Sequence, residues 1–235
     1  QNGSGKTTLA RCLSGYLRPT EGRVLSGDGL EISRLTPAQR VRRVGYVFQN
    51  PDHQLFRETV WDEVAFGPRN VGMPAELVEQ LVGRMLQDLE LEDKRHLHPF
   101  RLSKGDRQRL AVASIAVLRP AVLIVDEPTT GQDPVKAREI MDLLARLNRE
   151  DGICVIIISH AMDLVAEYAR RTIVMAGGQV LLDGPTREVF GQPEVLARSN
   201  VAPPPVSRLA LELGLDEIPI TIDEARAILQ GRWSR

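Results

Sequence analysis

The run from Gly3 to Thr8 has the residue types that bind the phosphates of a nucleotide. Gly3 and Gly5 allow successive backbone N–H groups to turn toward one anion. Lys6 supplies a positive charge for the β- and γ-phosphates, and Thr7 supplies a hydroxyl for Mg²⁺. A helix after the loop would direct the positive end of its dipole at the same phosphates. The run therefore predicts a phosphate-binding loop.

The sequence begins inside this loop. The pattern Gly-x-x-x-x-Gly-Lys-Ser/Thr would place its first glycine one position before Gln1. The strand that should lead into the loop is missing, and there is no initiator methionine. We expect the natural chain to extend further at its N-terminus.

Two carboxylates directly follow an apolar run in the second half of the chain. Val122 to Val125 is typical of a buried strand, and Asp126 and Glu127 come next. Ligands of open α/β sheets bind at the carboxyl ends of the strands. Asp126 is placed to hold the shell of Mg²⁺ through water, and Glu127 is placed to polarise the attacking water as a general base or an orienter. The pair predicts hydrolysis of a bound nucleotide.

Gln49 and His160 also follow predicted strands. The amide of Gln49 can contact Mg²⁺ or the attacking water, and His160 is expected at the same sheet edge as Glu127, near the γ-phosphate. Taken alone, each would be an ordinary surface residue of a turn. With the other signals, we expect Glu127, His160 and Gln49 to be catalytic, and Thr7, Gln49 and Asp126 to be metal ligands.

A second phosphate-binding helix start is predicted near Gly105. Ser103 is a residue type that caps helices, and the N-terminus behind such a cap is an anion site. One nucleotide does not need both helix starts from a single chain. The economical inference is a dimer in which each ATP lies between the loop of one chain and the second helix start of the other.

Strand and helix patterns alternate along the sequence, which predicts an α/β fold with a parallel sheet. Short apolar runs predict strands at 23–25, 44–48, 121–125 and 153–158, the last two buried. A hairpin is predicted at 173–182, turned at Gly177-Gly178. Helices are predicted after Thr36-Pro37 and Asp133-Pro134. The apolar stripe of the second is Ala137, Ile140, Met141, Leu144 and Leu147.

Helical segments are predicted elsewhere too. The first helix carries Leu9, Leu13 and Leu17 on one face. From 59 to about 117 the pattern becomes helical, and a four-residue repeat there is formed by Leu77, Leu81, Met85 and Leu89. We predict a main domain over 1–190 that contains this helical subdomain, and a C-terminal helical extension over 191–235. In that extension, Thr221 and Glu224 form a predicted capping box.

Composition limits the classes of partner. Lys and Arg total 30 and Asp and Glu total 31, so the formal net charge is −1. This balance disfavours an extended nucleic-acid or anionic-membrane surface. No apolar run approaches the ~20 residues that a membrane-spanning helix needs. Aromatic residues make up only 4% of the chain, yet half of them lie between Tyr46 and Phe66.

Together these motifs resemble the ATP-binding subunit of ATP-binding-cassette (ABC) transporters over roughly residues 1–190. Gly3–Thr8 is similar to the Walker A loop, Gln49 to the Q-loop and Leu102–Asp106 to the signature. Val122–Glu127 is similar to Walker B. Thr130–Asp133 is similar to the D-loop, and His160 to the switch histidine.

The resemblance implies an ABC-type ATPase with a RecA-like parallel sheet core, an inserted helical subdomain, and ATP and Mg²⁺ as cofactors. It implies a second ATPase subunit, a transmembrane coupling subunit, a substrate-binding membrane component and a place at the cytoplasmic face of the membrane. No nucleic-acid partner is expected. The implied nucleotide-binding residues are Asn2, Gly3, Ser4, Gly5, Lys6, Thr7, Thr8, Ser103, Gly105 and Asp106.

A narrower resemblance is to the ATPases of energy-coupling-factor importers, which serve vitamins, cobalt and nickel. Its residues are Val47–Phe56, the Leu-Ser-Lys-Gly-Asp signature and Thr129–Asp133. Lys104 and Asp106 depart from the general Leu-Ser-Gly-Gly-Gln signature, and Gln132 stands where leucine is usual.

The alternative is an ABC ATPase of a non-transport system. The DNA-repair class needs a long coiled-coil insertion, for which the interval from Lys6 to Ser103 has no room. The translation-associated class has two cassettes, and a second cassette upstream stays open.

In this family, a helix of the membrane subunit docks near the aromatic-rich window. Aromatic side chains are favoured anchors at interfaces. We expect Phe56 and Trp61, before Tyr46, to form that contact. The alternative is that the window seals the junction between the core and the helical subdomain.

Overall fold

The computed structural model describes residues 3–215 and 217–233. The chain forms two compact units. The first is Thr7–Ile158, and the second is Ser159–Arg235 together with the N-terminal residues up to Lys6.

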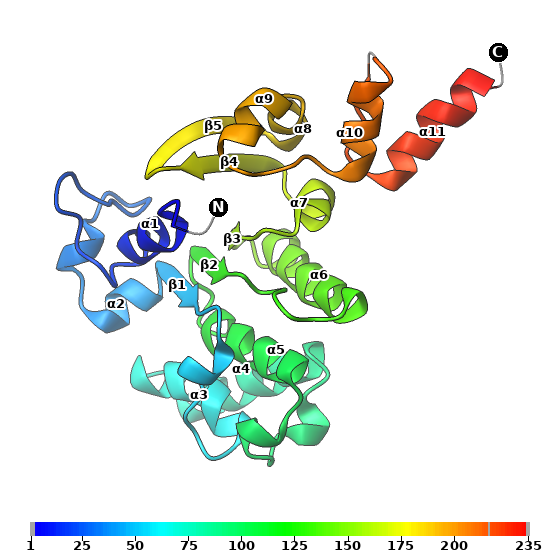
Figure 1. Cartoon of the computed structure of the whole chain (residues 1–235). Helices are drawn as coiled ribbons and strands as arrows, with labels where there is room; N and C mark the ends of the chain where they lie inside the picture. Colours follow the sequence, from blue (N-terminus) through cyan, green and yellow to red (C-terminus); the bar gives the residue numbers. More distant parts are fainter. Residues whose placement is uncertain (1–2, 216, 234–235) are drawn as a thin grey trace. The chain divides into compact units, whose positions relative to one another are not determined.

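The first unit is built on a parallel sheet of β1 (Val44–Val47), β2 (Val122–Asp126) and β3 (Cys154–Ile158), in the order β1-β2-β3 (Figure 1). Val44 lies opposite Val122, and Val122 lies opposite Cys154. Each parallel connection needs a crossover, and helices fill these connections. The predicted parallel α/β sheet is therefore confirmed.

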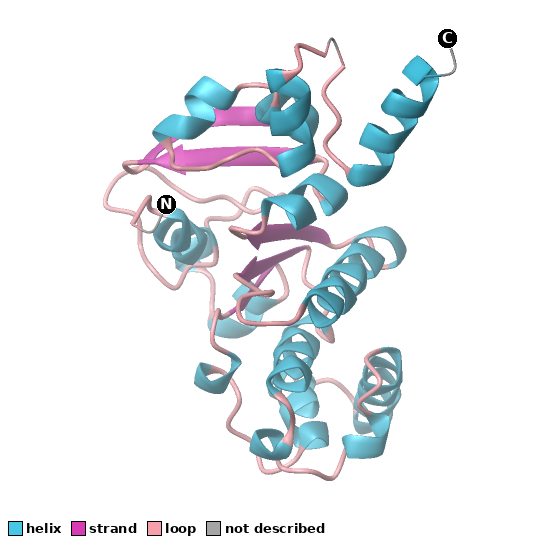
Figure 2. Cartoon of the chain, turned by 45° about the vertical axis from the view of Figure 1, so that its right-hand side comes forward, coloured by secondary structure: helices cyan, strands magenta, loops and turns pink. Residues whose placement is uncertain are grey.

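Six α-helices of this sheet unit are described: α1 (Lys6–Leu13, which starts at the last residue of the other unit), α2 (Pro37–Val41), α3 (Val60–Asn70), α4 (Ala75–Asp88), α5 (Lys104–Ala116) and α6 (Pro134–Glu150). Helix α5 packs against β1, β2 and α3, and α6 packs against β3. Between α3 and α5 the described chain is helical or irregular, without a strand (Figure 2). This matches the predicted helical character of 59–117, while the domain boundaries stay a prediction.

Local start signals placed several helices correctly. The side chain of Thr36 accepts a hydrogen bond from the N–H of Gln39 at the start of α2. That of Asp133 accepts from Val135 and Lys136 at the start of α6. The predicted apolar stripe of α6 is buried from Ala137 to Leu147. These predictions are confirmed because caps and stripes depend on residues within one or two turns.

The predicted four-residue repeat lies on α4 and its C-cap, and it is only partly buried. Val78, Val82 and Leu86 are buried, and of the repeat itself Leu89 is buried whereas Leu77 is 40% exposed. Apolar residues occupy two adjacent rows of this helix. Periodicity alone could not choose between the rows, and contact with α3 decided it.

Three other local predictions are corrected. Residues 23–25 form no strand, and only a single antiparallel bridge joins Leu25 to Glu31. Helix α1 ends at Leu13, so Leu17 lies outside it. Strand β3 is exposed at alternate positions, with Ile156 38% exposed, because successive side chains point to opposite faces and one face of β3 is only partly covered within the described unit.

The second unit contains an antiparallel hairpin of β4 (Arg171–Ala176) and β5 (Gln179–Pro185). Gly177 and Gly178 have φ of 56° and 79°, which confirms the predicted glycine turn. The other elements are α7 (Met162–Tyr168), α8 (Thr186–Phe190), α9 (Pro193–Arg198), α10 (Pro205–Glu212) and α11 (Ile222–Trp233).

The capping box before α11 is half formed. The Thr221 hydroxyl accepts from the N–H of Glu224 at 3.3 Å, but the Glu224 carboxylate accepts from the N–H of Ile220 at 2.9 Å. Phe190 and Leu196 are the buried centre of this unit. Among the helices of the described chain, none combines the length and apolarity that crossing a membrane requires.

Candidate functional site

The predicted phosphate loop leads into α1, which begins at Lys6. Gly3 and Gly5 have φ of 81° and 92°, a region that glycine adopts without steric cost. The Lys6 Nζ donates to the Ser4 hydroxyl at 2.9 Å. Ser4 is buried, and its carbonyl accepts from the N–H of Gly178 at 3.3 Å. The hairpin turn therefore braces the loop.

Asn2 lies outside the described residues. Thr8 lies on the first turn of α1, and the described hydrogen bonds do not test its predicted contact with the nucleotide. Both residues keep their predicted nucleotide contacts as proposals.

Asp126 ends β2 and is 2% exposed. Its Oδ2 accepts from the Thr7 hydroxyl at 3.0 Å and from the Tyr46 hydroxyl at 2.8 Å. Its Oδ1 is buried and has no hydrogen-bond partner among the described residues. A buried carboxylate oxygen without a partner is costly unless a ligand satisfies it.

This arrangement fits Mg²⁺. The ion prefers oxygen ligands, few of them from the protein, and completes its shell with water and phosphate. Oδ1 of Asp126 is a buried acceptor without a partner among the described residues, and a lone pair of the Thr7 hydroxyl can face a cation while its O–H donates to Oδ2. The described residues contain no group of three or more His, Cys, Asp and Glu side chains that could form a separate metal cage.

The sequence did not predict a role for the Tyr46 hydroxyl. Tyr46 is 3% exposed on β1, and burial together with the hydrogen bond to Asp126 raises its pKa to about 12. The hydroxyl therefore keeps its proton at neutral pH and stays a donor. The alternation of side chains along the strand is the sequence pattern that could have separated Tyr46 from its neighbours, because Tyr46 lies on the opposite face of β1 from Gly45 and Val47.

Glu127 follows Asp126 with φ of 49°, a left-handed conformation that non-glycine residues rarely adopt. Its N–H donates to the carbonyl of Ile158 at 2.9 Å, and its Oε2 accepts from the Thr130 hydroxyl at 3.0 Å. Glu127 is 8% exposed. Strained backbone of this kind clusters at functional sites because surrounding contacts impose it. Here the D-loop and the end of β3 impose it.

Gln49 is exposed in the bend after β1. Since β1 and β2 are parallel neighbours, Gln49 and Asp126 follow the same end of the sheet. His160 is exposed in the second unit, directly after Ser159, whose hydroxyl accepts from the N–H of Ala161 at 3.0 Å. The roles predicted for both residues remain proposals.

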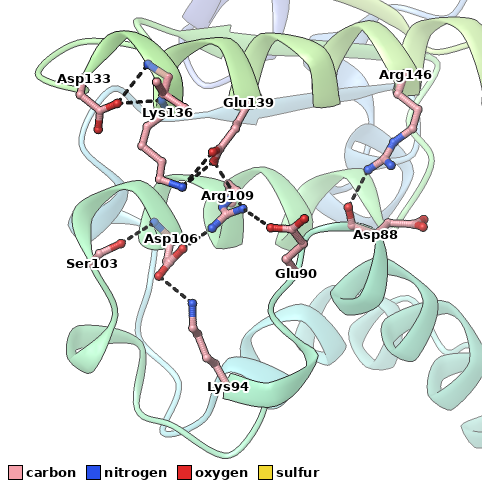
Figure 3. Close-up of polar contacts among 11 residues, drawn as sticks. Asp88, Glu90, Lys94, Ser103, Asp106, Arg109, Asp133, Lys136, Glu139 and Arg146 are labelled. Atoms are coloured by element: carbon pink, nitrogen blue, oxygen red, sulfur yellow. Dashed lines mark hydrogen bonds and ion pairs between the residues drawn. The ribbon is translucent and has the colours of Figure 1, made fainter.

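The signature segment forms the start of α5. Ser103 is the N-cap, and its hydroxyl accepts from the N–H of Asp106 at 3.1 Å, so the predicted cap is confirmed. Asp106 is buried and pairs with Arg109 and, at 3.1 Å, with Lys94 (Figure 3). Burial acts to raise the pKa of Asp106, but these two cations and the Ser103 contact together lower it.

Gly105 lies close to the D-loop of the same chain. A Cβ at Gly105 would lie 3.3 Å from Oε1 of Gln132. In the described residues, the hydrogen bonds and ion pairs of Ser103 and Asp106 stay within the helical segment and do not reach Thr7 or Asp126. These contacts therefore do not link the signature segment of a chain to Thr7 and Asp126 of the same chain.

The aromatic window divides into two clusters. The rings of Tyr46 and Phe48 are 5.0 Å apart and both pack against Tyr16. The rings of Phe56 and Phe66 are 4.9 Å apart. The first cluster contacts Asp126 through the hydroxyl of Tyr46, whereas the second is partly on the surface, with Phe56 60% exposed.

Comparison with known families and structures defines the class. The family described as ABC transporter matches residues 1–130. A putative ABC transporter ATP-binding protein of Methanosarcina acetivorans is 49% identical, over 98% of this chain and 38% of its own length. The energy-coupling factor transporter ATP-binding protein EcfA of Methanocaldococcus jannaschii is 42% identical, over 96% of this chain and 82% of its own length.

Solved structures agree with this result. CbiO1 of Clostridium perfringens, described as part of the ABC transporter complex cbiONQ, superposes with a TM-score of 0.75 at 35% identity. The superposition covers 92% of this chain and 85% of the CbiO1 chain. The ATP-binding cassette MJ0796, a dimer bound to ADP and Pi, superposes with a TM-score of 0.70 at 27% identity, over 80% of this chain and 83% of its own.

The chain belongs to the family of ABC transporter ATP-binding domains and has the α/β cassette fold of ABC ATPases. Within that family, its relatives include the energy-coupling-factor ATPases. The chain spans about two fifths of the length of several curated relatives that it matches, at 38%, 39% and 37%.

Proposed function

We propose that this chain is the ATP-hydrolysing domain of an importer of the energy-coupling-factor type, powering uptake of a vitamin or transition-metal ion. The observation that carries the proposal is the Asp126 carboxylate. It is held by the loop residue Thr7, has a buried free oxygen, and is followed by Glu127. Such a group suits magnesium-dependent cleavage of a nucleotide triphosphate.

Each residue has a defined task in this proposal. The loop residues Asn2 to Thr8 bind the phosphates, and Thr7, Asp126 and Gln49 hold Mg²⁺. Bound Mg²⁺ supplies positive charge to the β- and γ-phosphates. Glu127 accepts a proton from the attacking water or orients it, and His160 contacts the γ-phosphate.

A second cassette completes the site. Ser103, Gly105 and Asp106 form a helix start that is separate from the magnesium site of their own chain. We propose that Ser103 and Gly105 contact the γ-phosphate of ATP bound to the partner cassette, which is either an identical chain or a different one, while the buried Asp106 holds this helix start through Lys94 and Arg109. The dimer bound to ADP and Pi among the solved relatives supports this arrangement.

The test is nucleotide hydrolysis by the full-length protein. We expect MgATP hydrolysis that is lost when Mg²⁺ is chelated, together with cross-linking between cassettes that depends on ATP. Absence of both nucleotide binding and hydrolysis would contradict the proposed function. Co-purification with membrane subunits separates the importer from the non-transport alternative.

Phe56 and Trp61 are the proposed docking residues for the membrane subunit. Phe56 is 60% exposed on a loop anchored by buried Glu63, whose Oε2 accepts from the N–H groups of Phe56 and Arg57, both at 2.8 Å. Trp61 is partly exposed under the guanidinium of Arg95, 4.0 Å from its ring centroid. Docking through this surface places the chain at the cytoplasmic face of the membrane.

Replacing both Phe56 and Trp61 with alanine is expected to release the membrane partner, because each aromatic anchor of an interface is worth about 2 kcal/mol or more. Co-purification with the membrane subunits measures the loss, and nucleotide binding should stay unchanged. Phe100→Ala is the matched control, since Phe100 is 51% exposed elsewhere on the helical segment. Loss of ATP binding in the double variant would instead support the packing role.

A further inference from the structure

The hydroxyl of Tyr46 contacts the carboxylate that the proposed function assigns to magnesium. Its Oη donates to Oδ2 of Asp126 at 2.8 Å, and the Thr7 hydroxyl donates to the same oxygen at 3.0 Å. The other oxygen, Oδ1, is buried and has no partner among the described residues. Two donors therefore hold one side of the carboxylate, and the opposite side is left for a ligand.

A single donor would not fix this carboxylate. Rotation about the last torsion of aspartate is broad and roughly two-fold, so one hydrogen bond leaves the two oxygens free to exchange or tilt. Thr7 is also a proposed ligand, and its position follows the phosphate loop. A second donor on a different element removes that freedom.

Tyr46 is held by a strand and by packed rings, whereas Thr7 is held by the phosphate loop and the start of α1. It lies on β1 with Ile124 of β2 as its register partner, and from there its ring extends along β2 to Asp126. The rings of Tyr16 and Phe48 pack against it, with centroids at 5.7 Å and 5.0 Å. Strand pairing and ring packing together fix where the hydroxyl lies.

We propose that Tyr46 is a positioning residue whose hydroxyl fixes the Asp126 carboxylate so that Oδ1 faces Mg²⁺. Tyr46 itself contacts neither the cation nor the nucleotide. This inference rests on the proposed function, since it takes the magnesium role of Asp126 from there. Groups that orient metal ligands in this way typically change metal affinity about 10- to 100-fold when removed.

Tyr46→Phe removes the hydroxyl and keeps the ring. In the full-length protein, we expect the Mg²⁺ concentration that half-saturates the enhancement of ADP binding to rise about 10-fold. Binding of ADP in EDTA should be unchanged, and saturating MgCl₂ should restore the affinity of the wild-type protein. Calorimetric titration with ADP at a series of MgCl₂ concentrations measures all three quantities.

Tyr16→Phe is the matched control, because it deletes a hydroxyl from a ring of the same cluster that makes no described contact with Asp126. Its magnesium dependence should equal that of the wild-type protein. Tyr46→Met, which also fills the site with an apolar side chain, serves if the phenylalanine variant does not fold. Thermal unfolding without nucleotide checks the fold of each variant.

The outcomes are distinguishable. A wild-type magnesium dependence in Tyr46→Phe overturns the positioning role, and so does an equal loss of ADP binding at every Mg²⁺ concentration, which indicates packing alone. Failure of the wild-type protein to bind ADP with or without Mg²⁺ overturns the proposed function itself. A shift confined to magnesium dependence supports the inference.

Discussion

Glu127→Gln is expected to bind ATP as tightly as the wild-type protein and to hydrolyse it at least about 100-fold more slowly. The substitution keeps the size of the side chain and removes the base. Thr130 can still donate to the amide oxygen in place of Oε2, so the local geometry should persist. Steady-state phosphate release and equilibrium ATP binding by the assembled complex measure the two effects.

Glu90→Gln is the matched control for this variant. Glu90 is another glutamate in the left-handed region, with φ of 55°; its side chain is 85% exposed, lies 3.7 Å from Arg109, and makes no described contact with Asp126 or Glu127. The same chemical change there should leave hydrolysis within the error of the assay. Hydrolysis at the wild-type rate by Glu127→Gln would remove Glu127 from the proposed mechanism.

Features that depend on neighbouring residues could be predicted from the sequence. The caps Ser103 and Asp133 and the turn Gly177-Gly178 lie where their local signals place them. The apolar runs that became β1, β2 and β3 were recognisable as short apolar stretches of strand length, although only the burial predicted for β2 holds along its length. The order of strands and helices, and hence the α/β class, follows from these signals.

Features that depend on distant residues could not be predicted. The bond from Tyr46 to Asp126 joins positions 80 residues apart and needs the register of two strands. Two neighbouring apolar rows on α4 left its buried face undecided until α3 packed against it. The left-handed backbone of Glu127 is imposed by the carbonyl of Ile158 and the D-loop, which its own residue type does not indicate.

The same limit applied to Asp106. In the sequence it was a departure from the general signature, with no partner in view. In the structure it is the centre of a charged cluster that joins α5 to η3 (Glu92–Lys94) and, through Arg109, to α6 (Figure 3). This cluster predicts a large effect on stability.

Arg109→Met is expected to lower the free energy of unfolding by about 3 kcal/mol, the low end for breaking a buried ion pair. The Arg109 side chain is only 10% exposed, pairs with Asp106, and lies 3.7 Å from Glu139. Its removal leaves Asp106 buried with Lys94 as the remaining cation. For a chain of this size, that change should lower Tm by about 6–12 °C.

The effect should depend on pH with a defined sign. Arg109 and Lys94 hold the pKa of Asp106 below its usual range against the opposing effect of burial. A lowered folded-state pKa gives stability that is present above the unfolded pKa, about 4, and lost as the pH falls through the folded value. The difference in Tm between wild-type and Arg109→Met should therefore be full at pH 7 and shrink below about pH 4.

Arg84→Met is the control that separates this cluster from arginine removal in general. Arg84 lies on α4 with 69% of its side chain exposed and a weak contact to Asp88 at 3.8 Å. Exposed pairs of this kind contribute about 0–1 kcal/mol, so Tm should change little at any pH. Equal losses in the two variants, or a loss in Arg109→Met that persists at low pH, would show that Arg109 acts through apolar packing instead of through Asp106. A loss confined to Arg109 and to pH values above about 4 would show that the buried pair stabilises the helix that presents the signature.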